Sequence, residues 1–213
     1  MREKIERLCQ DGAQVRQWSS TLAQEWMEAE PESAGTLYVD GHVRVYHGSL
    51  TQLPRRYVAR QRLCLRGTTD YWVNAMDGQP FFVVTQAVDP GLIKVLEEQI
   101  VPRLLAEVPG QPSPEQLAAD PRLARFTMIF DRAGYSPEFF ERMRALRLAV
   151  ITYHKFPEGQ WGDEEFAPRK LRLINGEEVE LPLAERGVLL SNGMWVREVR
   201  HKDEKGHQTA MIT

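Results

Sequence analysis

The sequence contains only two cysteines among its 213 residues, Cys9 and Cys64, and they form neither a C-x-x-C pair nor a disulfide framework. The simplest interpretation is two reduced thiols in a reducing compartment. There is also no apolar run long enough to cross a membrane, and no basic segment followed by an apolar one that would mark a signal peptide. The expected location is therefore cytoplasmic, with no membrane partner.

Several signatures of common enzymes are absent as well. The chain has no G-x-S-x-G motif, no P-loop and no G-x-G-x-x-G motif, so nothing points to a serine hydrolase or a nucleotide-binding protein. Basic residues are not in excess, since 27 Lys and Arg against 30 Asp and Glu give a formal net charge of −3. The hydrophobic share of 42% and the charged share of 27% are those of an ordinary globular protein. The length fits one large domain, or a domain with an insertion.

Positive charge is nevertheless concentrated in one segment. Residues 53–66 contain five arginines and no acid. These arginines are Arg55, Arg56, Arg60, Arg62 and Arg66. Such a run can contact DNA phosphates, although a solvated basic face is the commoner explanation. We keep Arg55, Arg56, Arg60 and Arg62 as candidate DNA-binding residues.

The first half of the sequence predicts a helix followed by strands. Apolar residues recur at helical spacing over 3–28. Alternating apolar and polar residues then predict strands in TLYVDGHVRVYHG, YWVNAM and PFFVVTQAV, with Asp77-Gly78 as a turn between the last two. Asp89-Pro90 predicts a helix start, and the apolar residues from Leu92 to Leu104 line one face of that helix.

The second half predicts a strand, a helix and a second strand, followed by hairpins. FTMIFD and LAVITYH are short apolar strands, and Ser136-Pro137-Glu138 starts a helix between them. A βαβ unit of this length requires a parallel strand pair. After residue 155, Asn175-Gly176 and Asn192-Gly193 predict two β-hairpins, and the chain ends in a further strand-like segment.

Two aspartates are the candidate catalytic residues. Asp131 follows an apolar strand, at the edge where ligands bind in open α/β sheets, although an aspartate that caps the next turn is an equal alternative. Asp40 lies in VDGHV, where Asp-Gly favours a simple hairpin turn; the alternative is an acid carried on a strand. Two such carboxylates could bind Mg²⁺, which prefers oxygen ligands. Zinc held by Asp40, His42 and His47 is a weaker alternative, because alternation places the two histidines on opposite faces.

Taken together, six segments resemble the catalytic core of DDE-type insertion-sequence transposases, in particular bacterial ones. These segments, in matching order and spacing from about Gly35 onward, are GTLYVDGHVRVYHG, LPRRYVARQRLCLRGTTDYWVN, GQPFFVV, IVPRLL, FTMIFDRAGYSPEFF and ITYHKFP. The resemblance implies an α/β fold with a ribonuclease-H-like mixed sheet, flanking helices and a β-rich insertion near the C-terminus. It divides the chain into a helical segment (1–34), a partial core (35–156) and the insertion (157–213).

The resemblance also implies a reaction. Asp40 on the first core strand and Asp131 after the fourth would be ligands to Mg²⁺ (or Mn²⁺), so the resemblance favours the strand-borne alternative for Asp40. The chain would hydrolyse a DNA strand at the transposon end and transfer the freed 3′ hydroxyl to target DNA. Both DNAs are then partners, and we also consider a homodimer.

Two departures from the family limit this function. The family's third carboxylate, a Glu on a helix after the insertion, has no match before Thr213, because Glu178, Glu185 and Glu198 all fall in hairpin-like sequence. Ala133 also stands where an acidic residue is expected. We therefore expect a truncated core, weak or inactive in strand transfer. The alternatives are a non-catalytic DNA-binding or interaction protein that keeps the fold, and another metal-dependent nuclease on the same fold.

Overall fold

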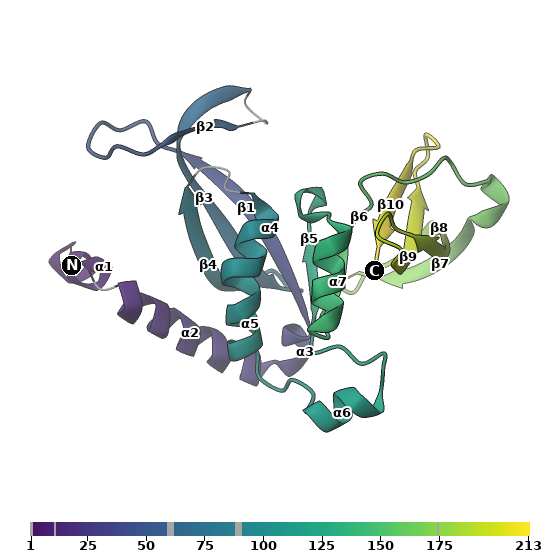
Figure 1. The fold of residues 1–213 in the computed structure, drawn as a ribbon, viewed down its shortest axis with the longest axis horizontal. Helices are drawn as coiled ribbons and strands as arrows, with labels where there is room; N and C mark the ends of the chain where they lie inside the picture. The colour runs from purple at the N-terminus through teal and green to yellow at the C-terminus, as the bar shows by residue number, and fades with distance from the viewer. Residues whose placement is uncertain (1, 11, 59–61, 88–90, 174) are drawn as a thin grey trace. The chain divides into compact units, whose positions relative to one another are not determined.

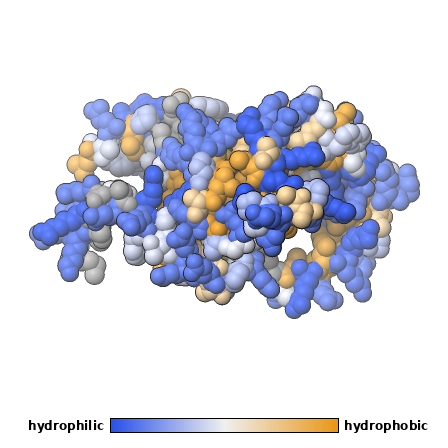
Figure 2. Space-filling model, turned by 60° about the horizontal axis from the view of Figure 1, so that its bottom comes forward, coloured by the Kyte–Doolittle hydropathy of each residue, from blue (hydrophilic) through white to orange (hydrophobic). Residues whose placement is uncertain are grey.

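A computed structural model describes residues 2–10, 12–58, 62–87, 91–173 and 175–213. The chain folds as two compact units, residues 1–111 and 112–213. Hydrophilic residues dominate the molecular face shown in Figure 2. In the described ranges, no helix has the length and apolar character needed to span a membrane.

The first unit is an antiparallel sheet with helices before and after it in the sequence (Figure 1). Its sheet order is β2-β3-β1, and β4 pairs with β3. The strands are β1 (Thr36–Val45), β2 (Arg55–Val58), β3 (Leu63–Ala75) and β4 (Pro80–Ala87). The helices are α1 (Arg2–Gln10), α2 (Gly12–Ala29), α3 (Pro31–Ala34), α4 (Leu92–Val95) and α5 (Val101–Glu107), with the π-helical turn η1 (Leu96–Ile100) between the last two.

The helices of the first unit form where the sequence predicted them, although Val15 and Trp18 of the predicted apolar repeat are exposed and Ala23 and Met27 of α2 are buried instead. The helix predicted over 3–28 is present as α1 and α2, and apolar residues of α2 and of the α4–α5 segment are buried. The π-turn ends two residues before Pro102, which has no N–H to bond the carbonyl of Glu98 and whose ring crowds that carbonyl. The predicted helix start at Asp89-Pro90 lies outside the described residues.

The second unit contains a mixed sheet with the order β5-β6-β10-β9-β8-β7. The pair β5–β6 is parallel and the others are antiparallel. The strands are β5 (Thr127–Phe130), β6 (Ala149–Tyr153), β7 (Ala167–Arg172), β8 (Glu178–Leu189), β9 (Trp195–Lys202) and β10 (Gln208–Ile212). The helices are α6 (Pro114–Ala119) and α7 (Pro137–Ala145), with the short turns η2 (Arg132–Gly134) and η3 (Asp163–Glu165). The predicted α/β class, with a mixed sheet and flanking helices, is confirmed.

Local signals in the second unit also predicted its elements correctly. The βαβ unit is formed by β5, α7 and β6, and the Ser136 hydroxyl caps α7 by accepting from the Phe139 amide at 3.2 Å. Gly176 and Gly193 have φ values of +84° and +82° in the turns that join β7 to β8 and β8 to β9. Glycine adopts this conformation without a Cβ clash, which is why Asn-Gly predicted both hairpins.

The hairpin interpretation of Asp40-Gly41 is wrong. β1 runs straight through both residues, with Asp40 opposite Trp72 and Gly41 opposite Tyr71 on β3. A Cβ on Gly41 would lie 3.0 Å from Cε1 of the Tyr71 ring, so glycine is favoured here by a close cross-strand approach rather than by a turn. Asp40 is therefore the strand-borne acid that the family resemblance implied.

Gly67 of β3 provides a test of the β1–β3 pairing. A Cβ at this position would lie 2.1 Å from the backbone carbonyl oxygen of Arg44, so one of the two strands must move. We expect Gly67→Ala to lower the free energy of unfolding by about 1–3 kcal/mol, as overpacking does, measured by urea denaturation. Gly187→Ala is the control, because its Cβ would meet Trp195 at an ordinary 3.5 Å. Equal urea concentrations at the unfolding midpoint for the two variants would contradict a close approach of β1 and β3 at Gly67.

Candidate catalytic residues and a buried ion-pair network

Asp40 lies in the middle of β1 and its side chain is exposed. Alternation along the strand puts Asp40 on the same face as His42 and Arg44, whereas Leu37 and Val39 point to the other face and are buried. The pairing of β1 with β3 fixes the backbone on which Asp40 stands. This acid is therefore presented to solvent by a rigid element.

The sequence reasoning missed Asp70, which lies on β3 opposite His42. Its carboxylate is buried and accepts hydrogen bonds from the Arg44 guanidinium and, at 2.8 Å, from the Thr85 hydroxyl. The ion pair orients Arg44 on the face that carries Asp40. An acid inside the strand-like segment TTDYWVNA was the available signal, since an isolated buried charge requires a partner.

The zinc alternative has no support in the structure. His42 is on β1, but His47 lies beyond the end of that strand. In the parts of the chain that the structure describes, no three His, Cys, Asp or Glu side chains gather in a group that could hold a metal ion.

Asp131 immediately follows β5, where the parallel strand ends, and its side chain is exposed. One carboxylate oxygen, Oδ1, accepts from the Ala133 amide at 2.8 Å and so caps η2. Its backbone carbonyl accepts from the Thr152 hydroxyl of β6 at 2.9 Å. The capping alternative is thus present, but it uses one oxygen only; Oδ2 accepts no hydrogen bond from any described residue.

The three glutamates considered for the third carboxylate all lie on strands, as the hairpin-like sequence predicted. Glu178 and Glu185 are on β8, and Glu198 is on β9. Glu185 is exposed and paired with Arg197, and Glu178 lies opposite Arg172. Glu198 is different, because it is only 1% exposed.

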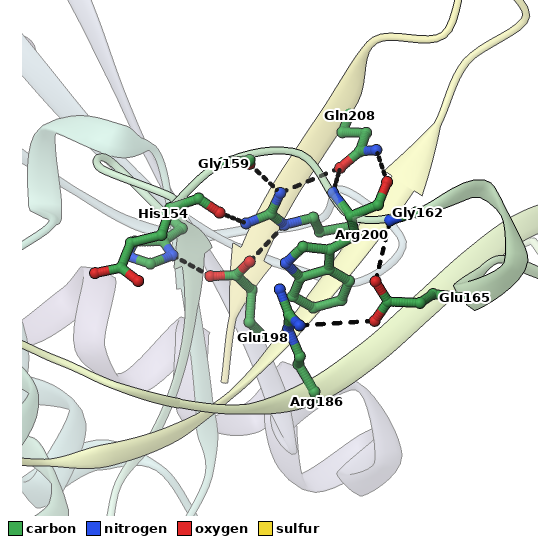
Figure 3. Close-up of polar contacts among 10 residues, drawn as sticks. His154, Gly159, Gly162, Glu165, Arg186, Glu198, Arg200 and Gln208 are labelled. Carbon is green, nitrogen blue, oxygen red and sulfur yellow. Dashed lines mark hydrogen bonds and ion pairs between the residues drawn. The ribbon is translucent and has the colours of Figure 1, made fainter.

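Glu198 is the centre of a buried ion-pair network in the second unit, shown in Figure 3. One of its oxygens accepts from Nε of Arg200 at 2.6 Å, and the other is bonded to Nδ1 of His154. Arg200 also donates to the backbone carbonyls of Gly159 and Glu158, at 2.7 and 3.1 Å, and to Gln208. These bonds tie β9 to the loop after β6 and satisfy both charges in the interior.

A pocket of about 820 Å³ lies beside this network, within the second unit. His154, Trp161, Arg186, Glu198 and Arg200 contribute to its lining, and the Tyr135 ring stacks on His154 at 5.4 Å between centroids. The guanidinium groups of Arg186 and Arg200 lie over the Trp161 ring at 4.1 and 4.3 Å from its centroid. Figure 3 shows Arg186 also directed at Glu165. The charged side chains of this wall form ion pairs and hydrogen bonds with one another. They therefore stabilise the wall of the pocket.

The candidate DNA-binding arginines lie around the β2–β3 hairpin of the first unit. Arg55 is exposed on β2, and Arg62 is exposed in the turn before β3, at φ +54°. Arg56 lies on β2 opposite Leu65. Arg60 lies outside the described residues.

The network predicts unequal costs for removing two acids. Glu198→Ala leaves the Arg200 charge buried and unpaired, so we expect a loss of about 3–5 kcal/mol in unfolding free energy, measured by chemical denaturation. Glu185→Ala on the neighbouring strand is the matched control, because its partner Arg197 is also exposed and stays hydrated. A comparable small loss in both variants would contradict a buried pair.

Tyr135 predicts a change at alkaline pH. Burial, and then the negative charges of Glu198 and Glu138, raise the pKa of its hydroxyl. Because the folded pKa exceeds the unfolded one, the associated stability is present below about pH 10 and is lost as pH rises through the folded value. Tyrosinate absorbance of the parent minus that of Tyr135→Phe should therefore titrate above the ordinary tyrosine range. If this difference in absorbance titrated within the ordinary tyrosine range, the burial and nearby negative charge described for Tyr135 would be contradicted.

Comparison with known proteins identifies the family. A solved structure of the piggyBac transposase synaptic complex with hairpin DNA is similar to this chain with a TM-score of 0.45 and 10% identity, covering 84% of this chain and 32% of that chain. The chain thus spans about a third of that transposase. No curated protein sequence matches it. The family model described as "Transposase protein" matches the whole of residues 1–213, so the chain belongs to this transposase family.

Proposed function

We propose that this chain is the core of a DDE-type transposase in which Asp40 and Asp131 bind Mg²⁺ (or Mn²⁺) for cleavage and transfer of a DNA strand. Family membership supports a role in transposition. The observation that carries the proposal is Asp40 itself, an exposed carboxylate in the middle of a regular strand, where no turn or ion pair with a described residue accounts for it.

The two aspartates have the chemistry that this role requires. Both side chains are exposed, and carboxylate oxygens are the ligands that Mg²⁺ prefers. Asp40 is held by the β1–β3 ladder, and Asp131 is held by its bonds to Ala133 and Thr152. The backbone that carries each acid is thus fixed before an ion binds. A bound divalent ion would supply activation of the attacking oxygen and stabilisation of the leaving one at the phosphodiester.

A second function, a DNA-binding protein of the same family without catalysis, has an observation of its own. Arg55 on β2 lies directly opposite Arg66 on β3. Directly opposed like charges destabilise a sheet, and a bound polyanion would remove that penalty. DNA affinity that falls steeply with salt but does not change with Mg²⁺ would favour this alternative over catalysis.

Other parts of the proposal come from the family resemblance. They are a division into residues 1–34, 35–156 and 157–213, recognition of transposon ends and target DNA, and a homodimer. We also propose a cytoplasmic location, which rests on the sequence features described above and not on the resemblance. Sedimentation of the purified chain with and without end DNA tests the homodimer.

Metal binding provides the direct test of the two acids. In Mn²⁺ and Mg²⁺ calorimetry we expect binding heat in the parent and a loss of about tenfold in affinity in both Asp40→Asn and Asp131→Asn, because each removes one of the anionic ligands that we propose. Asp163→Asn is the control. Its exposed side chain is paired with Lys202, and it lies neither on β1 nor immediately after β5, where the two candidate ligands are. Unchanged affinity in either variant would contradict the role proposed for that acid, and no heat in the parent would favour the non-catalytic alternative.

A further inference from the structure

The first unit presents a polar face that carries Asp40, here called the Asp40 face. Residues directly opposite one another on paired strands share a face, so Asp40 lies beside Trp72, His42 beside Asp70, and Arg44 beside Thr68. The three β1 residues on this face, Asp40, His42 and Arg44, are all exposed.

The Asp40 face continues onto the β2–β3 hairpin. Arg66 is two residues before Thr68 on β3, and the β1–β3 register is unbroken, so Arg66 lies on the same face. Arg55 of β2 is directly opposite Arg66, and Tyr57 is opposite Cys64. Arg55, Arg66 and Tyr57 are exposed. Figure 1 shows that β3 is a long strand, which pairs with β1 and β4 along one part and with β2 along another. Because β3 is common to these pairs, it links Asp40 of β1 to Arg66 of β3 and Arg55 of β2.

The cations on this face are arranged to receive an anion. Arg44 is held by the buried Asp70, yet its side chain is 66% exposed, and a guanidinium has five N–H donors. Holding a long side chain in place before binding reduces the entropy lost on binding. Arg55 and Arg66 form no ion pair with any described acid and face each other across the hairpin. Three guanidinium groups therefore follow Asp40 along one face.

We propose that the Asp40 face is a track for the phosphate backbone of DNA, in which Arg44, Arg66 and Arg55 bind successive phosphates leading away from Asp40. The inference rests on the proposed function, because it places the DNA that is cut at Asp40. Four residues of β-strand separate Asp40 from Arg44, or about 13 Å at about 3.3 Å per residue. Tyr57 lies at the far end of the track.

The track differs from the basic run that the sequence suggested. Arg55 belongs to both, but Arg44 lies outside residues 53–66 and is flanked in the sequence by Val43 and Val45. Only the strand register brings Arg44, Arg66 and Arg55 to one face. DNA binding should therefore depend on Arg44 and Arg66, and much less on Arg62 in the turn before β3.

The test is the salt dependence of DNA binding by the full chain, measured by fluorescence anisotropy with a labelled duplex. Each lost phosphate contact lowers the slope of log affinity against log salt by about 0.9. We expect Arg55→Gln/Arg66→Gln to lower the slope by about two, and addition of Arg44→Gln to lower it by a further unit. Arg169→Gln/Arg172→Gln on the exposed strand β7 is the matched control and should leave the slope unchanged.

The outcomes separate this inference from the proposed function. If the parent binds DNA and the Arg55/Arg66 variant behaves like the control, the track is wrong while DNA binding by the transposase stands. If the parent shows no salt-dependent binding at all, the proposed DNA partner fails, and the track with it. Arg55→Gln/Arg66→Gln disturbs no buried group, so it keeps the test valid even if Arg44→Gln, which leaves Asp70 without its cation, unfolds the chain. Circular dichroism checks the fold of each variant.

Discussion

The antiparallel pairing of β1 with β3 is the constraint on which the first unit depends. It extends from Leu37 opposite Ala75 to Val45 opposite Gly67, and it fixes which side chains enter the core and which meet solvent. A slip of one residue would exchange the two faces, moving Asp40 inward and Val39 outward. The burial of Leu37, Val39 and Val73 opposes that slip, because exposing them would lose hydrophobic stabilisation. The candidate catalytic acid is thus positioned by apolar residues that take no part in its chemistry.

The second unit depends on a different kind of interaction. Glu198 and Arg200 are both buried on β9, and each is satisfied by groups from other elements, including His154 and the carbonyls before Trp161. A buried ion pair adds little net stability over apolar packing, but breaking it is costly. The network therefore selects one arrangement of the loop after β6 over others. That arrangement forms the wall of the pocket beside Tyr135.

Much of the fold could be predicted from short stretches of sequence, because the responsible interactions are local. The hydroxyl of Ser136 caps the helix three residues later, and the Asn-Gly pairs at 175 and 192 supply glycines with positive φ. The same rule was wrong for Asp40-Gly41, where the glycine makes room for the Tyr71 ring on another strand. Propensity identifies a residue that suits a turn, but it does not reveal a cross-strand neighbour 30 residues away.

The sequence by itself determined the α/β class, the βαβ unit and the hairpins at 175 and 192, since apolar periodicity, capping residues and turn residues act over a few positions. The two candidate acids came from the sequence as well, but Asp40 was chosen through the family resemblance and against its local turn signal. Only the tertiary structure decided that Asp70 is buried against Arg44, that Glu198 is enclosed with His154 and Arg200, and that Arg44, Arg66 and Arg55 share a face. The physical reason is that the energy and the role of a charged side chain depend on its partners and its burial. Both are set by strand register and packing between residues far apart in the chain.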